Sequence, residues 1–240
     1  ILWFFQHIQG ETIDMEVGFE RILADIDDKK LLLTIGKDGI LWKLDREKGS
    51  FIDLKETINQ NIYQKVDRNK GKVFYRDDIL LSKIDTPFSA CPGIYGGHNW
   101  QAVSYDPESH LMVIPLHQLC ADMIGRYVER KEGGGGYGAN SRNYKMDNTN
   151  GKVGKLVTID IKNMEKIWQY EQDAMFLTGS LSTAGGLTFI GDLDRKFMAF
   201  DTKTGILLWD TTLGSALHGF PVTYAVNGKQ YIAVQTGMGV

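Results

Sequence analysis

Four carboxylates stand close together near the start of the chain, in the stretch QGETIDMEVGFERIL (Gln9–Leu23), as Glu11, Asp14, Glu16 and Glu20. In an extended segment, side chains two positions apart point to the same face, so Asp14 and Glu16 can present two carboxylates to one ligand. A carboxylate in such a place can accept a proton from a substrate hydroxyl or bind a hard cation. An acid in a polar loop is more often simply solvated, and these residues alone leave both interpretations open.

The two cysteines, Cys91 and Cys120, show no CxxC pattern, no CxxCH haem signature and no zinc-ligand spacing. Two interpretations remain for the pair. They are either two buried free thiols or one disulfide, and a disulfide would indicate an oxidising compartment.

The composition is that of a globular protein, with 240 residues of which 42% are hydrophobic. This length suits one large all-β domain or two small ones. With 27 basic against 30 acidic residues and a net charge of −3, the chain lacks the basic surface that nucleic acid or anionic lipid would require. The chain opens on ILWFF without an initiator Met or a basic leader, so we expect it to be an internal piece of a longer protein.

Four segments share a pattern of strand, turn and strand. In FMAFDTKTGILLW (Phe197–Trp209), Asp201 begins the turn, Gly205 closes it, and Trp209 follows the aspartate by eight residues. The aspartate can accept hydrogen bonds from backbone N–H groups of the turn, and glycine supplies a positive φ. The other segments are LVTIDIKNMEKIW at 156–168, ILWKLDREKGSFI at 40–52 and AVSYDPESHLMVI at 102–114. This repetition predicts the antiparallel blades of a β-propeller.

The register of the repeat places Trp3 where the tryptophan of a preceding unit should stand, so the chain is expected to begin within a blade. About four blades are predicted, and propellers usually close with roughly four to eight. An open half propeller exposes two sheet edges. We therefore expect the remaining half of the propeller, or another chain, to cover them.

The glycine-rich run KEGGGGYGANSRN (Lys131–Asn143) is predicted to be a flexible surface insertion between blades. A phosphate-binding loop is the functional alternative. It is disfavoured because the run has no GK[ST] ending and no strand–loop–helix context.

Three segments resemble the pyrroloquinoline-quinone (PQQ)-dependent alcohol dehydrogenases. These are residues 179–234, which include TAGGLTFIG, the stretch CPGIYGGHNWQAVSYDPESHLMVIPLHQLC (Cys91–Cys120), and IGKDGILWKLDREKG (Ile35–Gly49). The resemblance covers almost all of the chain, in the order of the family. It implies a periplasmic, eight-bladed quinoprotein propeller with the quinone on its axis, of which residues 1–240 form the C-terminal half.

The resemblance also implies roles for particular residues. Asp14 aligns with the acid that the family uses as catalytic base, and Lys37 with a basic residue that reaches the quinone carbonyl oxygens. Asn99 aligns with an asparagine that hydrogen-bonds the cofactor. Trp100, beside it, either lines the cofactor pocket or packs in the core.

Three further residues are assigned by the same comparison. Glu16 stands where relatives of the lanthanide-using branch carry an extra acid, so Asp14 and Glu16 are expected to be close to a calcium or lanthanide ion; a solvated Glu16 is the alternative. Cys91 and Cys120 match the structural disulfide pair of the family.

The function implied is oxidation of an alcohol to an aldehyde, with hydride passing to PQQ and electrons leaving to a cytochrome or quinone acceptor. The piece alone is expected to be inactive. One alternative is a quinoprotein glucose or polyol dehydrogenase, because that branch has sequences similar to TAGGLTFIG. A second alternative is a non-catalytic propeller scaffold of the outer-membrane assembly type.

Overall fold

The protein is built almost entirely of antiparallel strands, as predicted from its sequence. A computed structural model describes residues 1–134 and 138–237. The first blade is a four-stranded meander in the order β1-β2-β3-β4, formed by β1 (Ile22–Ile26), β2 (Lys29–Ile35), β3 (Ile40–Asp45) and β4 (Phe51–Glu56). The third blade has the same plan, with β14 (Leu181–Ser182), β15 (Leu187–Gly191), β16 (Lys196–Asp201) and β17 (Leu207–Thr212).

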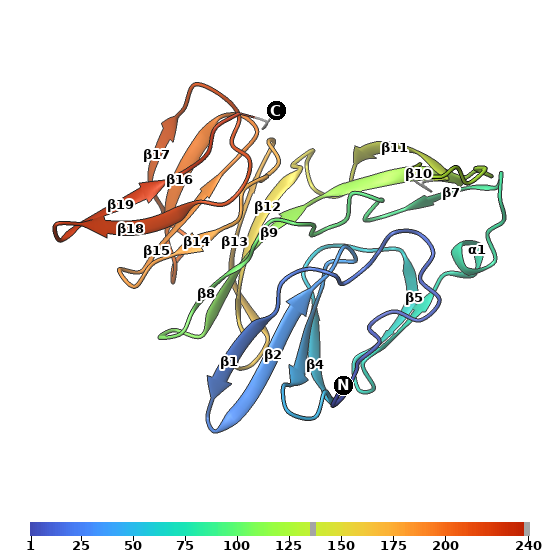
Figure 1. The fold of residues 1–240 in the computed structure, drawn as a ribbon, viewed down its shortest axis with the longest axis horizontal. Helices are drawn as coiled ribbons and strands as arrows, with labels where there is room; N and C mark the ends of the chain where they lie inside the picture. Colours follow the sequence, from blue (N-terminus) through green and yellow to red (C-terminus); the bar gives the residue numbers. More distant parts are fainter. Residues whose placement is uncertain (135–137, 238–240) are drawn as a thin grey trace.

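The second blade lies between them and is interrupted in the sequence (Figure 1). Its sheet has the order β13-β12-β9-β8, formed by β8 (Ser104–Asp106), β9 (Leu111–His117), β12 (Gly154–Asp160) and β13 (Glu165–Gln172). The predicted hairpins at 102–114 and 156–168 therefore belong to one blade, because β9 and β12 pair directly with each other. The prediction of a separate blade for each hairpin is wrong at this point.

The remaining elements form smaller sheets. A three-stranded sheet in the order β11-β10-β7 combines β7 (Pro87–Ala90), β10 (Leu119–Gly125) and β11 (Ala139–Lys145). Two-stranded sheets are formed by β5 (Tyr63–Asp67) with β6 (Lys72–Tyr75), and by β18 (Val222–Val226) with β19 (Lys229–Ala233). Of the predicted insertion 131–143, residues 139–143 belong to β11, and 135–137 lie outside the described residues.

The single helix of the described residues is α1 (Asp77–Leu80), which precedes β7. Among the residues that the structure describes, no helix has the length and apolar character needed to cross a membrane.

The predicted aspartate turns all form, and a fifth one joins them. In each turn the carboxylate accepts a hydrogen bond from the backbone N–H two residues later, at 2.8–3.1 Å. The residue four positions after each aspartate is left-handed, with φ between +58° and +72°, and it need not be glycine. The turns are Asp45–Gly49, Asp67–Gly71, Asp106–His110, Asp160–Met164 and Asp201–Gly205.

Tryptophans join neighbouring blades through these turns. The Trp168 indole N–H donates to the Thr202 carbonyl at 2.9 Å, and a Cβ built on Gly205 would lie 2.4 Å from the Trp168 ring. Trp3 repeats this arrangement on the first blade, donating to the Arg46 carbonyl at 3.1 Å, and its ring would meet a Cβ built on Gly49. Trp3 therefore makes the contact that its register predicts.

We expect Gly205→Ala to destabilise the protein by about 3 kcal/mol, because the new methyl group meets the Trp168 ring in a backbone conformation that disfavours side chains. Gly186→Ala is the matched control, since Gly186 also has a positive φ of +78° but faces open space. The control should lose only about 1 kcal/mol from the backbone. Equal losses in urea denaturation would contradict the role assigned to the tryptophan contact.

The disulfide predicted between Cys91 and Cys120 is present, and it ties the segment after β7 to β10. Both cysteines of the described chain are used in it. The prediction is therefore confirmed, and the alternative of two free thiols is excluded for this structure.

Removing the disulfide by Cys91→Ala and Cys120→Ala together is expected to cost about 3.5 kcal/mol of folding free energy, given the 29-residue separation that the bond closes. Urea denaturation with and without reductant measures the loss. Reductant should destabilise the unaltered protein by the same amount and leave the double variant unchanged. A double variant that still responds to reductant would refute this assignment of the effect.

Candidate functional site

The acidic loop before β1 is held by its own side chains. The Glu11 carboxylate accepts hydrogen bonds from the backbone N–H groups of Ile13, at 2.6 Å, and Met15, at 3.0 Å. Met15 is completely buried, whereas the Asp14 side chain between these residues is 45% exposed. Asp14 has a φ of +69°, which turns the loop at this point. The loop therefore anchors its apolar residues and presents the Asp14 carboxylate to solvent.

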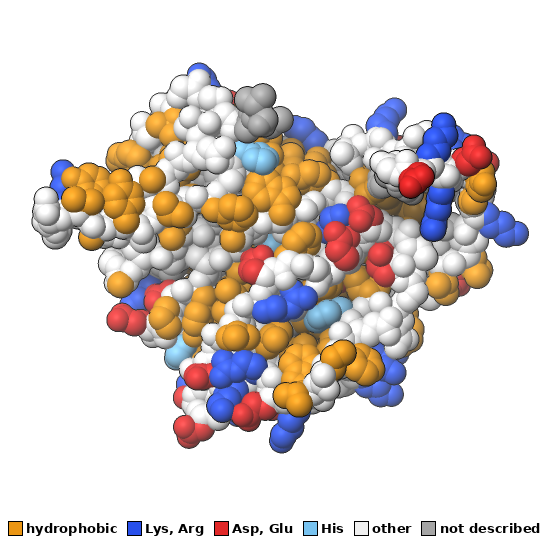
Figure 2. All heavy atoms as spheres, in the orientation of Figure 1, with side chains coloured by type: hydrophobic (Ala, Val, Ile, Leu, Met, Phe, Trp, Pro, Cys, Tyr) orange, Lys and Arg blue, Asp and Glu red, His pale blue; other side chains and the backbone are white. Residues whose placement is uncertain are grey.

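Lys37 brings the two predicted carboxylates together. Its Nζ lies 2.8 Å from Oδ2 of Asp14 and 3.0 Å from Oε1 of Glu16, and its side chain is only 8% exposed. The Lys37 backbone N–H also donates to the Glu16 carbonyl at 3.2 Å. The second carboxylate oxygen of Glu16, Oε2, is buried and has no hydrogen-bond partner in the described chain. In Figure 2, acidic and basic side chains meet near the middle of the face shown, among hydrophobic ones.

The charge state of Lys37 follows from these contacts. Burial alone would lower the pKa of Lys37, but hydrogen bonds and charge attraction from Asp14 and Glu16 outweigh burial, and the pKa is raised above its ordinary value. The ammonium is therefore a permanent cation between two carboxylates.

Gly96 and Gly97 bring the next loop against Lys37. The Gly97 N–H donates to the Lys37 carbonyl at 2.7 Å. Gly96 has a φ of +86°, and a Cβ built on it would lie 2.6 Å from Cγ of Lys37. Glycine is therefore required at 96 for this close approach of the two loops.

Asn99 and Trp100 lie on this second loop but do not contact the carboxylates. The Asn99 amide donates to the Tyr95 carbonyl at 2.7 Å and accepts from the Trp100 N–H at 2.9 Å, which fixes the loop's shape. The Trp100 ring lies 4.5 Å, centroid to centroid, from His218 and 5.8 Å from Phe220. Of the predicted site residues, the structure thus brings Asp14, Glu16 and Lys37 into direct contact, and joins the Asn99 loop to them through backbone.

Two buried histidines, His98 on this loop and His117 at the end of β9, carry no charge at neutral pH. His98 bonds through Nδ1 to the Pro115 carbonyl at 3.0 Å, and His117 through Nε2 to the Phe176 carbonyl at 2.9 Å. Burial lowers the pKa of each histidine to about 4. His98 is therefore a structural residue.

Asp38 is a titratable residue that sequence reasoning missed. It is completely enclosed beside Lys37, accepting a hydrogen bond from the Ile40 N–H at 3.0 Å and from the Tyr63 hydroxyl at 3.2 Å. Burial raises the pKa of Asp38 to about 7, against the smaller opposing effect of these hydrogen bonds. Its position two residues before the largely buried strand β3 is the signal that could have indicated it.

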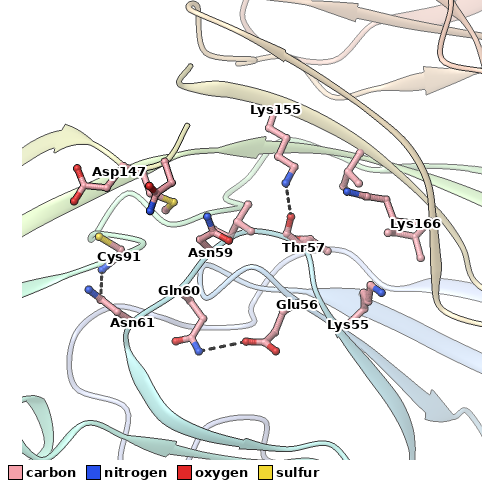
Figure 3. Close-up of a pocket in the computed structure, with 15 residues that line it drawn as sticks. Lys55, Glu56, Thr57, Asn59, Gln60, Asn61, Cys91, Asp147, Lys155 and Lys166 are labelled. Atoms are coloured by element: carbon pink, nitrogen blue, oxygen red, sulfur yellow. Dashed lines mark hydrogen bonds between the residues drawn. The ribbon is translucent and has the colours of Figure 1, made fainter. Parts of the chain in front are cut away.

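Two sizeable cavities lie at different distances from this site. The larger, of about 770 Å³, lies between the first and second blades, where Lys155 reaches across to the Thr57 carbonyl at 2.9 Å (Figure 3). Cys91 is the one predicted site residue that lines it. The smaller cavity, of about 560 Å³, is lined by Asp14 itself. The smaller cavity is therefore the one that adjoins the candidate base.

Comparison with known proteins shows what this chain is similar to. A family model described as "Glucose/ethanol/alcohol dehydrogenase, beta-propeller domain" (PQQ) matches residues 139–232. A quinohemoprotein alcohol dehydrogenase, ADH-IIG, from Pseudomonas putida is 29% identical over 99% of this chain and 35% of its own length. The lanthanide-dependent methanol dehydrogenase of Methylacidiphilum fumariolicum is 28% identical over 99% of this chain and 40% of its own length.

Solved structures agree with these matches. A europium-containing methanol dehydrogenase superposes with a TM-score of 0.89 at 26% identity, covering 95% of this chain and 41% of its own. The quinohemoprotein alcohol dehydrogenase of Comamonas testosteroni gives 0.85 at 27% identity, covering 98% of this chain and 36% of its own. The chain thus spans between a third and about two fifths of these relatives. It belongs to the PQQ-dependent alcohol dehydrogenase family and forms a C-terminal portion of the family's β-propeller.

Proposed function

We propose that the whole protein containing this chain oxidises an alcohol to an aldehyde with PQQ as its oxidant. The observation that carries the proposal is the contact of Lys37 with Asp14 and Glu16, at 2.8 and 3.0 Å, in a chain of this family. Dehydrogenation of an alcohol needs a group that accepts the hydroxyl proton, and Asp14 supplies a carboxylate for it. Two observations support this assignment. The acidic loop resembles the corresponding loop of the family, and the Asp14 side chain is exposed.

The residues present suit a hard metal ion beside the base. Asp14 and Glu16 offer carboxylate oxygens, the ligands that calcium and trivalent ions prefer, and Oε2 of Glu16 is left without a partner. The described residues contain no group of three or more His, Cys, Asp or Glu side chains that would hold a metal by themselves. We therefore propose that Asp14 and Glu16 contribute part of the ligand set for calcium or a lanthanide, to be completed by other groups.

Each residue of the site has a defined task in this proposal. Oδ2 of Asp14 is bonded to Lys37, while no described residue donates a hydrogen bond to Oδ1, which leaves that oxygen to take the alcohol proton. The Lys37 ammonium has three N–H donors and uses two on carboxylates, so one remains for a cofactor oxygen. Asn99 and Trp100 shape the loop that contacts the cofactor. When bound, the quinone supplies the two-electron oxidant that takes hydride from the alcohol carbon.

The compartment of the enzyme and its electron acceptor are inferred from the family and from the disulfide. A bond between Cys91 and Cys120 is expected to persist in an oxidising compartment, and we propose the periplasm. Electrons would leave the reduced cofactor to a cytochrome or a quinone; a relative from Thauera butanivorans is named 1-butanol dehydrogenase (cytochrome c).

The test is reconstitution of the full-length protein with PQQ and either calcium or a lanthanide, followed by dye-linked oxidation of a panel of alcohols, glucose and glycerol. Turnover of alcohols that needs both the quinone and the metal is the expected result. Faster turnover of glucose than of any alcohol would favour the glucose or polyol dehydrogenase alternative. A lack of turnover in every combination, with the quinone unbound, would favour a non-catalytic scaffold.

A further inference from the structure

The larger cavity, of about 770 Å³, is separate from the acidic loop, because no residue of that loop lines it. It opens between the first and second blades, and its volume falls within the range typical of small-molecule sites. Part of its wall is apolar and belongs to the buried core: Ile58, Met146, Val157 and Ile159. The cavity therefore has room, and an apolar surface, for the carbon skeleton of a small molecule.

Three lysines line the same cavity, and they come from both blades. Lys55 belongs to β4 of the first blade, whereas Lys155 and Lys166 belong to the paired strands β12 and β13 of the second. Lys155 is only 8% exposed, and in Figure 3 its side chain points from its strand toward Thr57 of the first blade. A ligand in this cavity can therefore meet ammonium groups from both blades.

The described residues leave these ammonium groups incompletely paired. None of the three lysines has a carboxylate oxygen within 4.0 Å in the part of the chain that the structure describes. The buried Lys155 ammonium donates to the Thr57 carbonyl at 2.9 Å, so two of its three N–H donors have no described acceptor. Lys166 bonds the side chain of Gln169 at 2.7 Å. A buried donor without an acceptor is costly, so the free N–H groups of Lys155 favour an acceptor inside the cavity.

The acidic side chains of the lining do not balance the lysines. Glu56 is bonded to Arg68 at 3.0 Å, and Arg68 does not line the cavity. Asp147 forms no ion pair within the described residues, and in Figure 3 it lies on the side of Cys91, far from Lys166. Three ammonium groups therefore share the cavity with one carboxylate that has no cation of its own.

The pKa of Lys155 agrees with this arrangement. Burial lowers the pKa of Lys155, the charge of Glu171 opposes that effect, and the charge of Lys166 adds to it. The ammonium form of Lys155 is thus disfavoured by its surroundings, and an anion placed beside it would relieve this.

We propose that this cavity binds a small organic dianion, a dicarboxylate, that joins the first blade to the second. One carboxylate would face Lys155 and Lys166, the other would face Lys55, and the carbon chain would contact the apolar wall. Inorganic phosphate has the charge but no carbon atoms for that wall, and a neutral sugar leaves the ammonium groups unpaired. The proposed dehydrogenation does not use this site.

The experiment is a calorimetric titration of the full-length protein with sodium succinate at constant ionic strength. Butyrate, inorganic phosphate and glucose are titrated for comparison. Succinate should bind once per chain and about tenfold more tightly than any of these three, because it alone offers two carboxylates and a carbon chain. Its binding should also raise the midpoint of thermal unfolding, since it joins two blades of the folded state.

Variants of the lysines test the two ends of the site. Lys155→Met and Lys55→Met should each weaken succinate binding about tenfold, because one carboxylate loses a charged donor. Lys55 is partly exposed and forms no hydrogen bond through its amine within the described residues, so its variant should fold even if the Lys155 variant does not. Lys55→Met should leave butyrate binding within twofold.

Lys43→Met is the matched control. Lys43 is 7% exposed and also links the first blade to the second, through the Ile161 and Lys162 carbonyls at 2.8 and 2.9 Å, but it does not line the cavity. Its loss removes a comparable contact between blades and should leave the affinity for succinate within twofold.

Several results would overturn the dicarboxylate site. These are a folded protein without saturable succinate binding, equal affinities for succinate and butyrate, tighter binding of phosphate or glucose, and a Lys43 variant that weakens succinate binding as much as the Lys55 variant does. Each readout is a binding constant or an unfolding midpoint that needs neither quinone nor alcohol. The site is therefore tested independently of the proposed function.

Discussion

Replacing Asp14 by Asn lowers kcat for alcohol oxidation about a thousandfold in the full-length, reconstituted protein, if Asp14 is the proton acceptor. An amide of the same size cannot take the alcohol proton, but its oxygen can still accept the hydrogen bond that Lys37 donates at 2.8 Å. The loop should therefore keep its shape. Quinone binding, followed by absorbance, should change by no more than a few-fold, so that the loss is confined to turnover.

Asp28→Asn is the matched control for this variant. Asp28 is an exposed aspartate in the turn between β1 and β2, and its φ of +64° is close to the +69° of Asp14. The substitution therefore has the same chemistry and a similar backbone setting, away from Lys37. It should leave kcat unchanged. If Asp14→Asn kept kcat within tenfold of the unaltered protein, the assignment of the base would be wrong, while the dehydrogenase itself could still stand.

Local turn chemistry was the part of the fold most open to prediction from sequence. An aspartate bonds the N–H two residues later whatever the rest of the chain does, so the turns at Asp45, Asp106, Asp160 and Asp201 could be predicted from a few residues each. The equivalent turn at Asp67 was missed because no long apolar strands flank it: β5 and β6 are short and partly exposed.

Assignment of strands to blades was less predictable, because it depends on pairing between distant segments. Strands β9 and β12 pair along seven residues although β10 and β11 stand between them in the chain. Nothing local distinguishes a hairpin within one blade from a hairpin in the next. The relation between the turns at Asp106 and Asp160 therefore needed the three-dimensional structure.

The candidate site, like the fold, combines features that the local sequence predicts with contacts that depend on distant segments. The proximity of Asp14 and Glu16 followed from their spacing, but the approach of Lys37 depends on the first blade folding back 23 residues along the chain. The family resemblance, not the residue pattern, selected Lys37. Neither source indicated that Gly96 must lack a side chain so that its loop can pack against Lys37, because that contact involves two loops from different blades.

Asp38→Asn is expected to change how stability depends on pH, since Asp38 is buried beside the site and its pKa is raised to about 7. The unfolded carboxyl titrates near its ordinary pKa of about 4. Below pH 4 the group is neutral in both states and burial of a charge costs nothing. As pH rises to 7 the unfolded state ionises first, so the folded state loses stability. The full cost, about 4 kcal/mol, is reached above pH 7.

Urea denaturation between pH 4 and pH 8 measures this effect as the difference between the unaltered protein and Asp38→Asn. The histidine contributions cancel in that difference, because His98 and His117 are present in both proteins. Relative to the unaltered protein, the variant should gain about 4 kcal/mol between pH 4 and pH 8. Tyr63→Phe should have the opposite effect on the pH dependence of stability. The Tyr63 hydroxyl bond lowers the pKa of Asp38, so removing this bond raises that pKa and extends the loss of stability to higher pH. Parallel curves of stability against pH for all three proteins would contradict this prediction. They would show that Asp38 ionises alike in the folded and unfolded states, and that solvent reaches its carboxyl group beside Lys37.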